Sequence, residues 1–343
     1  MEELFAAVKE SACRGIGPKL EGILIDAGDM DRIQQTVHHL RDIPYNECGV
    51  ECTLTPMMNK GDFSFSIEKE TAEAAIQQGR PVSQWLGYEE SIEGSRLESF
   101  LIHWLDKESF LYYCTKAVFL EMDTSNKEKY RVPGVFVRLQ HEKGNAKWYE
   151  MVTRAVLQSL AIVLTEQKRQ FIESYFRRFS DISEYFLLGV MFSRDDSPLK
   201  LVGRYMNAPE AREAMKSFGC DILEYMEECD WEKIVEFSSG LINLSLDFTD
   251  KIEPRLGFEI ESSEKDESVL DWLIEKGCCD SEKRQAVCNW PGTTSLCSSS
   301  NLRKDLTLQY KISHFKVVVR PDTPMQAKVY LECSMDSKYS CRY

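Results

Sequence analysis

Several segments that assign a protein to a common class are missing from this chain of 343 residues. The sequence contains no run of about 18 apolar residues, so no membrane-spanning helix is expected. The start, Met1 to Glu10, has neither the basic nor the apolar stretch of a secretory signal, which makes the cytoplasm the expected location. Low-complexity tracts are also missing, and the 43% hydrophobic content is too high for a disordered chain.

Positive charge is scarce relative to negative charge. The chain has 42 Lys and Arg residues against 56 Asp and Glu residues, which gives a net charge of −14. Phosphate contacts need a basic surface, so this balance argues against a nucleic-acid partner.

The common catalytic and metal-binding motifs are missing too. No P-loop, G-x-G-x-x-G fingerprint, G-x-S-x-G elbow or H-E-x-x-H pair occurs, so no nucleotide cofactor is expected. The five histidines show no triad or metal spacing. Among the 12 cysteines, the densest group (Cys278, Cys279, Cys288 and Cys297) lacks the C-x2-C pairs of zinc sites, and in a reducing compartment most thiols should be free.

What the chain does contain is a recurring strand–loop–strand pattern. The loops are rich in Pro, Gly, Asn and Asp, which favour turns. The pattern predicts five hairpins, near residues 49–67, 117–139, 186–204, 241–260 and 314–331.

Helical patterns separate these hairpins. Residues 280–310, rich in Ser and Thr, show the least legible pattern and could form a loop over one end of the fold. The expected helices lie within residues 2–40, 82–113, 147–178, 208–218, 221–239 and 267–276.

Side chains alternate regularly along the expected strands. In the first hairpin Val50, Cys52 and Phe63 share one face, while Glu51 and Asp62 share the other. All five hairpins have one aliphatic and one mostly polar face. Helices can cover the aliphatic face, and a sheet of about ten strands tends to curl or close.

The predicted fold class is therefore α+β. We expect a closed ten-stranded antiparallel β-barrel built from five helix–hairpin–helix repeats, with the helices outside and a polar lumen. It would form a single domain over residues 1–335, followed by a flexible tail at 336–343. The alternative is two stacked α+β domains, each with a solvated sheet face.

This pattern resembles the ABBA, or PT-barrel, aromatic prenyltransferases. The segment from Asp62 to Ile67 is similar to the Asp-Phe-Ser-Ile-Ser strand of the bacterial members, in which the Asp and the first Ser face the diphosphate and its Mg²⁺. The resemblance implies that Asp62 could bind Mg²⁺ and that Ser64 contacts the substrate. Lys328 and Tyr330 match the Lys-x-Tyr strands that grip the prenyl diphosphate, and Lys200 and Arg255 occupy corresponding strand starts.

The resemblance implies an enzyme that moves an allylic prenyl group from a diphosphate donor to an aromatic small molecule. The leaving diphosphate needs several cations, and cations on the polar face are the candidates. These are Arg138, Lys200, Arg204, Arg255, Lys316, Arg320 and Lys328.

A carboxylate can then remove the proton of the aromatic acceptor. The candidates for this base are Glu51, Glu121, Asp247 and Glu259. Phe136 and Tyr330 could stabilise the allyl cation through their ring faces.

Two alternatives stay open, because the expected lumen has few aromatic residues and many carboxylates. Such a lumen shields an allyl cation less well and could repel a diphosphate. The same barrel could catalyse a cyclisation or isomerisation by acid–base chemistry. It could also bind a small molecule without catalysis.

Overall fold

The computed structural model of this chain describes nine stretches of residues. They are 20–40, 42–45, 47–85, 92–124, 133–194, 198–248, 252–296, 306–321 and 323–335. The tail expected at 336–343 and the first 19 residues lie outside these ranges. The boundaries of the single domain therefore stay a prediction.

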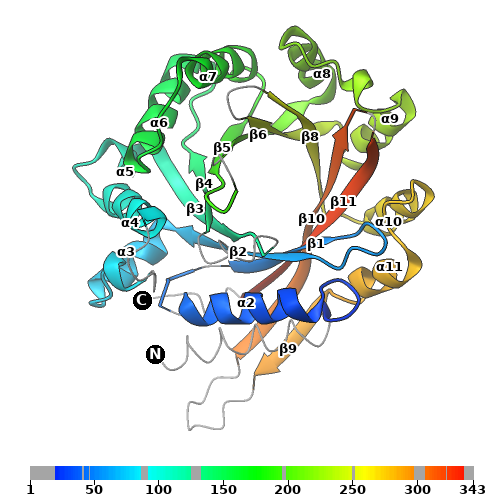
Figure 1. The fold of residues 1–343 in the computed structure, drawn as a ribbon, viewed down its shortest axis with the longest axis horizontal. Coiled ribbons are helices and arrows are strands. Elements are labelled where there is room, and N and C mark those ends of the chain that lie inside the picture. Colours follow the sequence, from blue (N-terminus) through cyan, green and yellow to red (C-terminus); the bar gives the residue numbers. More distant parts are fainter. Residues whose placement is uncertain are drawn as a thin grey trace.

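Ten antiparallel strands close into a barrel. Consecutive strands pair in order from β1 to β8, then β8 pairs with β10, β10 with β11, and β11 with β1. Figure 1 shows the closed ring of strands seen end-on. The strands are β1 (Glu47–Thr53), β2 (Gly61–Glu68), β3 (Thr115–Met122), β4 (Gly134–Leu139), β5 (Tyr185–Val190), β6 (Leu199–Asn207), β7 (Leu241–Phe248), β8 (Ile252–Glu261), β10 (Leu306–Arg320) and β11 (Thr323–Met335).

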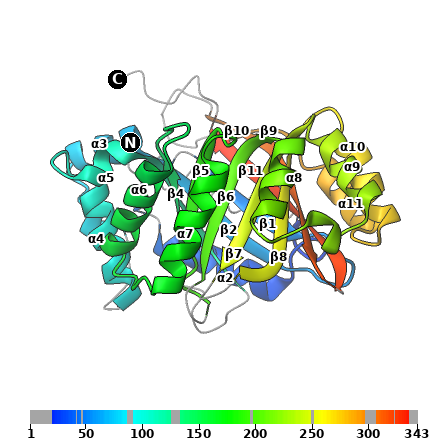
Figure 2. The same cartoon turned by 90° about the horizontal axis from the view of Figure 1, so that it is seen from above.

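Helices surround the barrel, as Figures 1 and 2 show. The closed sheet excludes the alternative of two stacked domains. The helices are α2 (Ala27–His39), α3 (Lys69–Gln77), η1 (Val82–Gln84), α4 (Ile92–Leu105), α5 (Phe110–Cys114), α6 (Ala146–Ser159), α7 (Glu166–Phe179), α8 (Ala208–Ser217), η2 (Ile222–Glu224), α9 (Glu228–Phe237), α10 (Asp266–Glu275) and α11 (Ser281–Cys288).

The alternation of the strands decides which face the helices cover. The aliphatic face of each hairpin points outward and is buried, as with Val50 and Cys52 of β1. Aromatic rings fill one such interface: Phe186 of β5 packs edge-on against Tyr149 of α6 at 4.7 Å and against Phe176 of α7 at 5.1 Å between ring centroids. Burial of each ring stabilises the fold by on the order of 2 kcal/mol. The polar face of the same strands is left to line the lumen.

One prediction about the helices was wrong. The long helix expected over 147–178 is two helices, α6 and α7. Ala161 has a positive φ of 52° directly after α6, and the Thr165 side chain accepts a hydrogen bond from the Lys168 amide to begin α7. Both features end one helix and start another.

The loop expected at 280–310 contains regular structure as well. It holds α11, capped by the Asp280 side chain, and a short strand, β9 (Gly292–Leu296), which among the described strands pairs with β10 alone. In Figure 1, β9 lies outside the ring. The helical segments between hairpins thus differ in number and length, so a uniform helix–hairpin–helix repeat stays a prediction.

Two further expectations concern helices and thiols. No helix among the described residues is long and apolar enough to cross a lipid bilayer. Nine cysteines in the described part of the chain are free thiols.

Candidate active site

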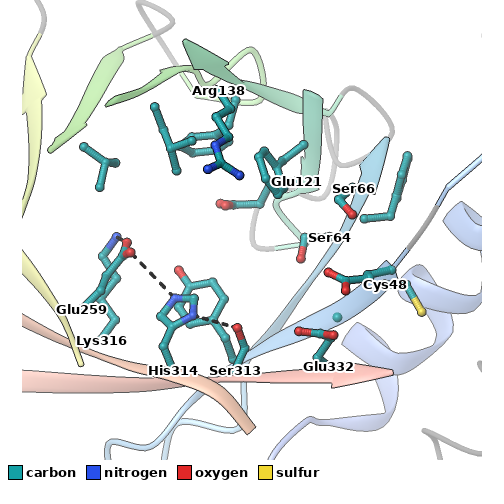
Figure 3. A pocket seen from close by; sticks show the side chains of 18 of the residues that line it. Cys48, Ser64, Ser66, Glu121, Arg138, Glu259, Ser313, His314, Lys316 and Glu332 are labelled. Atoms are coloured by element: carbon teal, nitrogen blue, oxygen red, sulfur yellow. Dashed lines mark hydrogen bonds and ion pairs between the residues drawn. The ribbon is translucent and has the colours of Figure 1, made fainter. Parts of the chain in front are cut away.

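A cavity of about 240 Å³ lies inside the barrel. The residues that line it lie toward one end of the barrel, at which β1 and β5 begin and β6 and β11 end. Figure 3 shows polar side chains facing one another across it, Arg138 and Glu121 on one side and Glu259, Lys316 and His314 on the other. The residues predicted from the sequence that line it are Ser64, Glu121, Arg138, Lys200, Arg204, Glu259, Lys316 and Tyr330, together with Phe136.

Glu259 is held by two cationic side chains and lies near a histidine. Its carboxylate accepts a hydrogen bond from Lys316 Nζ at 3.0 Å and another from Arg204 Nη1, and His314 Nε2 lies 4.0 Å away. Burial alone would raise the pKa of Glu259, but Lys316 and Arg204 hold it well below its ordinary range. Burial lowers the pKa of His314 to about 4, so the imidazole is neutral near pH 7.

Lys200 has a looser partner. Its Nζ lies 3.8 Å from Asp247 Oδ1 and 5.5 Å from the centroid of the Phe136 ring. Burial lowers the pKa of Lys200 to about 8, although Asp247 acts in the opposite direction. The ammonium is therefore mostly charged at neutral pH and loses its proton in mildly alkaline solution.

Arg138 and Tyr185 pair through a cation–π contact. The guanidinium carbon of Arg138 lies 4.2 Å from the centroid of the Tyr185 ring, and both residues line the cavity. Tyr185 and Phe136 add to Tyr330, Phe119 and Phe65, so five Phe and Tyr residues border the cavity.

Glu121 differs from the other predicted carboxylates. Within the described residues it forms no ion pair or hydrogen bond through its side chain, and it lines the cavity. Burial, followed by the negative charge of Glu51, raises its pKa. A carboxyl group with a raised pKa and free oxygens is suited to take up a proton.

The other predicted residues lie elsewhere in the barrel. Glu51 accepts hydrogen bonds from Lys328 Nζ and the Tyr330 hydroxyl. Burial would raise the pKa of Glu51, but Lys328 and Tyr330 hold it well below its usual range. Neither Glu51 nor Lys328 lines the cavity. Register places them toward the end of the barrel at which β1 ends and β2 begins.

The buried Asp247 and the half-buried Arg255 form another ion pair outside the cavity. Arg255 Nη1 lies 3.4 Å from Asp247 Oδ2. Arg320 ends β10 and is exposed, so the structure does not bring it into the cavity with the other predicted cations.

Asp62, the residue expected to hold Mg²⁺, also lies outside the cavity. Its Oδ1 accepts a hydrogen bond from the Thr124 amide at 2.9 Å and lies 3.3 Å from the Thr124 hydroxyl. Burial and the negative charge of Glu51 raise the pKa of Asp62 to about 8. The described residues form no group of three convergent metal ligands that includes Asp62. The donor set at Asp62 therefore does not fit a metal site by itself, and the assignment stays a prediction.

Several lining residues were not predicted. Tyr185 and Glu47 lie one and two residues before the strand starts expected from the sequence, and Glu332 lies one residue beyond an expected end. Extending the alternation by one pair of residues would have found Glu47. His314 was on the correct strand, but a single histidine without a motif gave no signal.

Comparisons with known proteins give a clear result for the fold. No model of a known protein family matches the chain, and no curated protein matches it in sequence. Solved structures do match. The 5-dimethylallyltryptophan synthase from Streptomyces coelicolor is 12% identical with a TM-score of 0.55, and the match covers 98% of this chain and 99% of that one.

A second match is the prenyltransferase PriB without ligand, which is 11% identical with a TM-score of 0.51 and covers 98% of this chain and 96% of that one. The Streptomyces coelicolor enzyme is also solved in complex with DMASPP and Trp, at 13% identity, a TM-score of 0.53, and coverage of 99% and 97%. These likenesses span nearly the whole chain, and they confirm the PT-barrel fold predicted from the sequence.

Proposed function

We propose that this protein transfers an allylic prenyl group from a diphosphate donor to an aromatic small molecule inside its barrel. The observation that carries the proposal is the joint lining of one cavity by four cations (Arg138, Lys200, Arg204 and Lys316) and five Phe and Tyr residues. Two structural neighbours are solved in complex with tryptophan and either DMASPP or DMSPP, which supports this pair of substrates. A cytoplasmic location stays a prediction from the N-terminal sequence.

The cations stabilise the leaving group in this proposal. The donor's C–O bond breaks, and the diphosphate leaves with the electron pair. Its negative charge is met by Lys200, Lys316 and Arg204, which lie on β6 and β10. The rings of Phe136, Tyr185 and Tyr330 face the cavity, where they shield the allyl cation from water.

Glu121 serves as the base. A carbon of the aromatic acceptor forms a bond to the allyl cation, and the ring then loses a proton to the Glu121 carboxylate. Glu51, Asp247 and Glu259 are each engaged in ion pairs, which makes them weaker candidates. The raised pKa of Glu121 favours proton uptake near neutral pH.

Magnesium could assist in neutralising the diphosphate, because this hard cation binds carboxylate and phosphate oxygens. Asp62 is the residue implied for it. Because Asp62 does not line the cavity, no step of the proposed reaction depends on the metal.

One observation favours a second function. The four cations of the cavity are matched by four carboxylates (Glu47, Glu121, Glu259 and Glu332), so the formal charge of the lining is zero. A neutral lining suits an acid–base cyclisation or isomerisation of an uncharged small molecule, and also simple ligand binding without turnover.

The deciding experiment offers dimethylallyl or geranyl diphosphate with a panel of indoles and phenols. Product masses are read by mass spectrometry. Prenyl transfer predicts an acceptor heavier by one prenyl group and release of diphosphate. Absence of product with every pair, together with no diphosphate binding in calorimetry, would favour the acid–base reaction. A retained ligand without turnover would favour a binding protein.

A further inference from the structure

The carboxylate of Glu259 occupies an anion site made by other residues. Lys316 Nζ and Arg204 Nη1 both donate to it, and His314 Nε2 lies 4.0 Å away. These donors come from β6 and β10, two strands that do not pair with each other. Side chains from separate strands thus converge on one point inside the cavity.

The site is buried as well as charged. The side chains of Arg204, Glu259 and Lys316 are 12%, 8% and 5% exposed. Arg204 is fixed further by Glu261, whose Oε1 accepts from Nη2 at 2.8 Å, and its guanidinium carbon lies 5.6 Å from the Tyr205 ring. The donors are therefore held in place before any ligand arrives.

Phosphate and carboxylate oxygens accept hydrogen bonds from the same donors at similar distances. We propose that Glu259 stands in for a phosphate group of the donor, so that a diphosphate binds by displacing its carboxylate from Lys316 and Arg204. This inference rests on the proposed diphosphate donor. It adds that Glu259 neutralises the donor-binding cations when no diphosphate is bound.

The charge balance explains why such a counter-ion is useful. Without Glu259, the Lys316 ammonium and Arg204 guanidinium would lie close together in a poorly solvated space. With it, the empty site is stable, but an incoming ligand must compete with an attached carboxylate. A diphosphate carries more charge than one carboxylate, so it can compete where a singly charged anion cannot.

A second carboxylate is arranged in a similar way. Asp247 lies between Lys200, at 3.8 Å, and Arg255, at 3.4 Å, and only Lys200 of these three lines the cavity. This longer pair would give way more easily than that of Glu259. Neutralising either carboxylate should therefore strengthen the binding of a diphosphate.

The test is calorimetric titration of inorganic pyrophosphate into the wild-type protein and Glu259→Gln. We expect the variant to bind pyrophosphate about tenfold more tightly or better, because one competing charge is gone. A matched control is Glu228→Gln, which removes one carboxylate from the exposed Arg212–Glu228 pair on the outer helices and should leave the affinity unchanged. Equal or weaker binding by Glu259→Gln would overturn the inference.

Two further measurements keep the test decisive if Glu259→Gln folds poorly. Pyrophosphate should raise its thermal midpoint more than that of the wild type. Asp247→Asn should also bind pyrophosphate more tightly than the wild type, and an unchanged or lower affinity there contradicts the inference. If the variants bind pyrophosphate more tightly but no donor gives prenyl transfer, the inference about Glu259 holds and the proposed function is wrong. If the protein transfers a prenyl group but both variants bind pyrophosphate more weakly, the proposed function holds and the inference is wrong.

Discussion

The two halves of the lumen use the same residue types in different ways. In the half that holds the cavity, Glu121 has no partner among the described residues, Lys200 is loosely paired, and Arg138 faces an aromatic ring. In the other half, toward the end of the barrel at which β1 ends and β2 begins, Glu51 accepts hydrogen bonds from both Lys328 and Tyr330. Arg194 Nε donates to Asp123 at 2.9 Å. Charge on an inner strand face therefore does not identify a ligand contact. The cavity half also contains a fully paired carboxylate, Glu259, so the halves differ only in the groups that lack a close counter-ion.

The largest expected effect concerns the unpaired carboxylate of the cavity half. Glu121→Gln removes the proposed base, so turnover should fall by roughly 10²–10⁴-fold, while the free energy of unfolding changes by less than about 1 kcal/mol. Product formation under saturating substrates and urea unfolding give the two values. Wild-type turnover in this variant would assign the base to another residue. The surface variant Glu228→Gln should retain full turnover.

Substitutions in the half of the lumen that contains Glu51 and Lys328 should lower the free energy of unfolding. Lys328→Met leaves the Glu51 carboxylate buried without its ion pair, so unfolding should become easier by roughly 3–5 kcal/mol. Lys200→Met in the cavity half should cost only about 1 kcal/mol, because Asp247 keeps Arg255. Urea unfolding of both variants measures the contrast. Equal losses would mean that the two halves do not differ as described.

The raised pKa of Asp62 predicts that stability depends on pH. Its pKa in the folded protein, about 8, lies above its ordinary 3.8, so between these values the folded state holds more protons than the unfolded state. Stability from this group therefore falls as the pH rises from about 4 to 8. Asp62→Asn cannot lose a proton, so it should be more stable than the wild type at pH 9 and equally stable near pH 4.

The same variant tests the metal assignment. If Asp62 binds Mg²⁺, millimolar Mg²⁺ should raise the melting temperature of the wild type at pH 8 but not that of Asp62→Asn. An identical response of the two proteins to Mg²⁺ would remove the assignment.

The smallest expected effect is a shift in a pH profile. Lys200 must be charged to bind an anionic donor, so kcat/KM should decline above pH about 8 as the ammonium loses its proton. Lys200→Arg keeps its charge at higher pH, and the decline should move upward by about one unit or more. Identical profiles would mean that another group controls the decline.

The sequence was sufficient to predict the barrel because strand alternation is a local signal. Val50 and Glu51 occupy opposite faces whatever the rest of the chain does, and the same logic placed Arg138, Lys316 and Tyr330 in the lumen. Alternation says which face a side chain occupies but not its depth. For this reason Ser64 and Asp62, two residues apart on β2, were expected to act together, yet only Ser64 lines the cavity.

The ion pairs were harder to predict, because the two partners of a pair lie far apart in the sequence. Arg204 and Glu259 are 55 positions apart in the chain, and Lys328 and Glu51 are 277 apart. Such pairs depend on how far neighbouring strands are shifted along one another when the barrel closes. Similarly, the exposure of Arg320 follows from its place at the tip of the β10–β11 hairpin, which hydrophobic periodicity does not report.

The pairing of β1 with β11 has a consequence for how the chain folds. The opposed residues Cys48 and Cys333 are 285 positions apart, so the barrel closes only after almost the whole chain has been made. Until then the backbone amides and carbonyls of the β1 edge are unpaired and can bind another strand. Contacts over such separations form slowly, so this seam should be the last to form and the place where newly made chains aggregate.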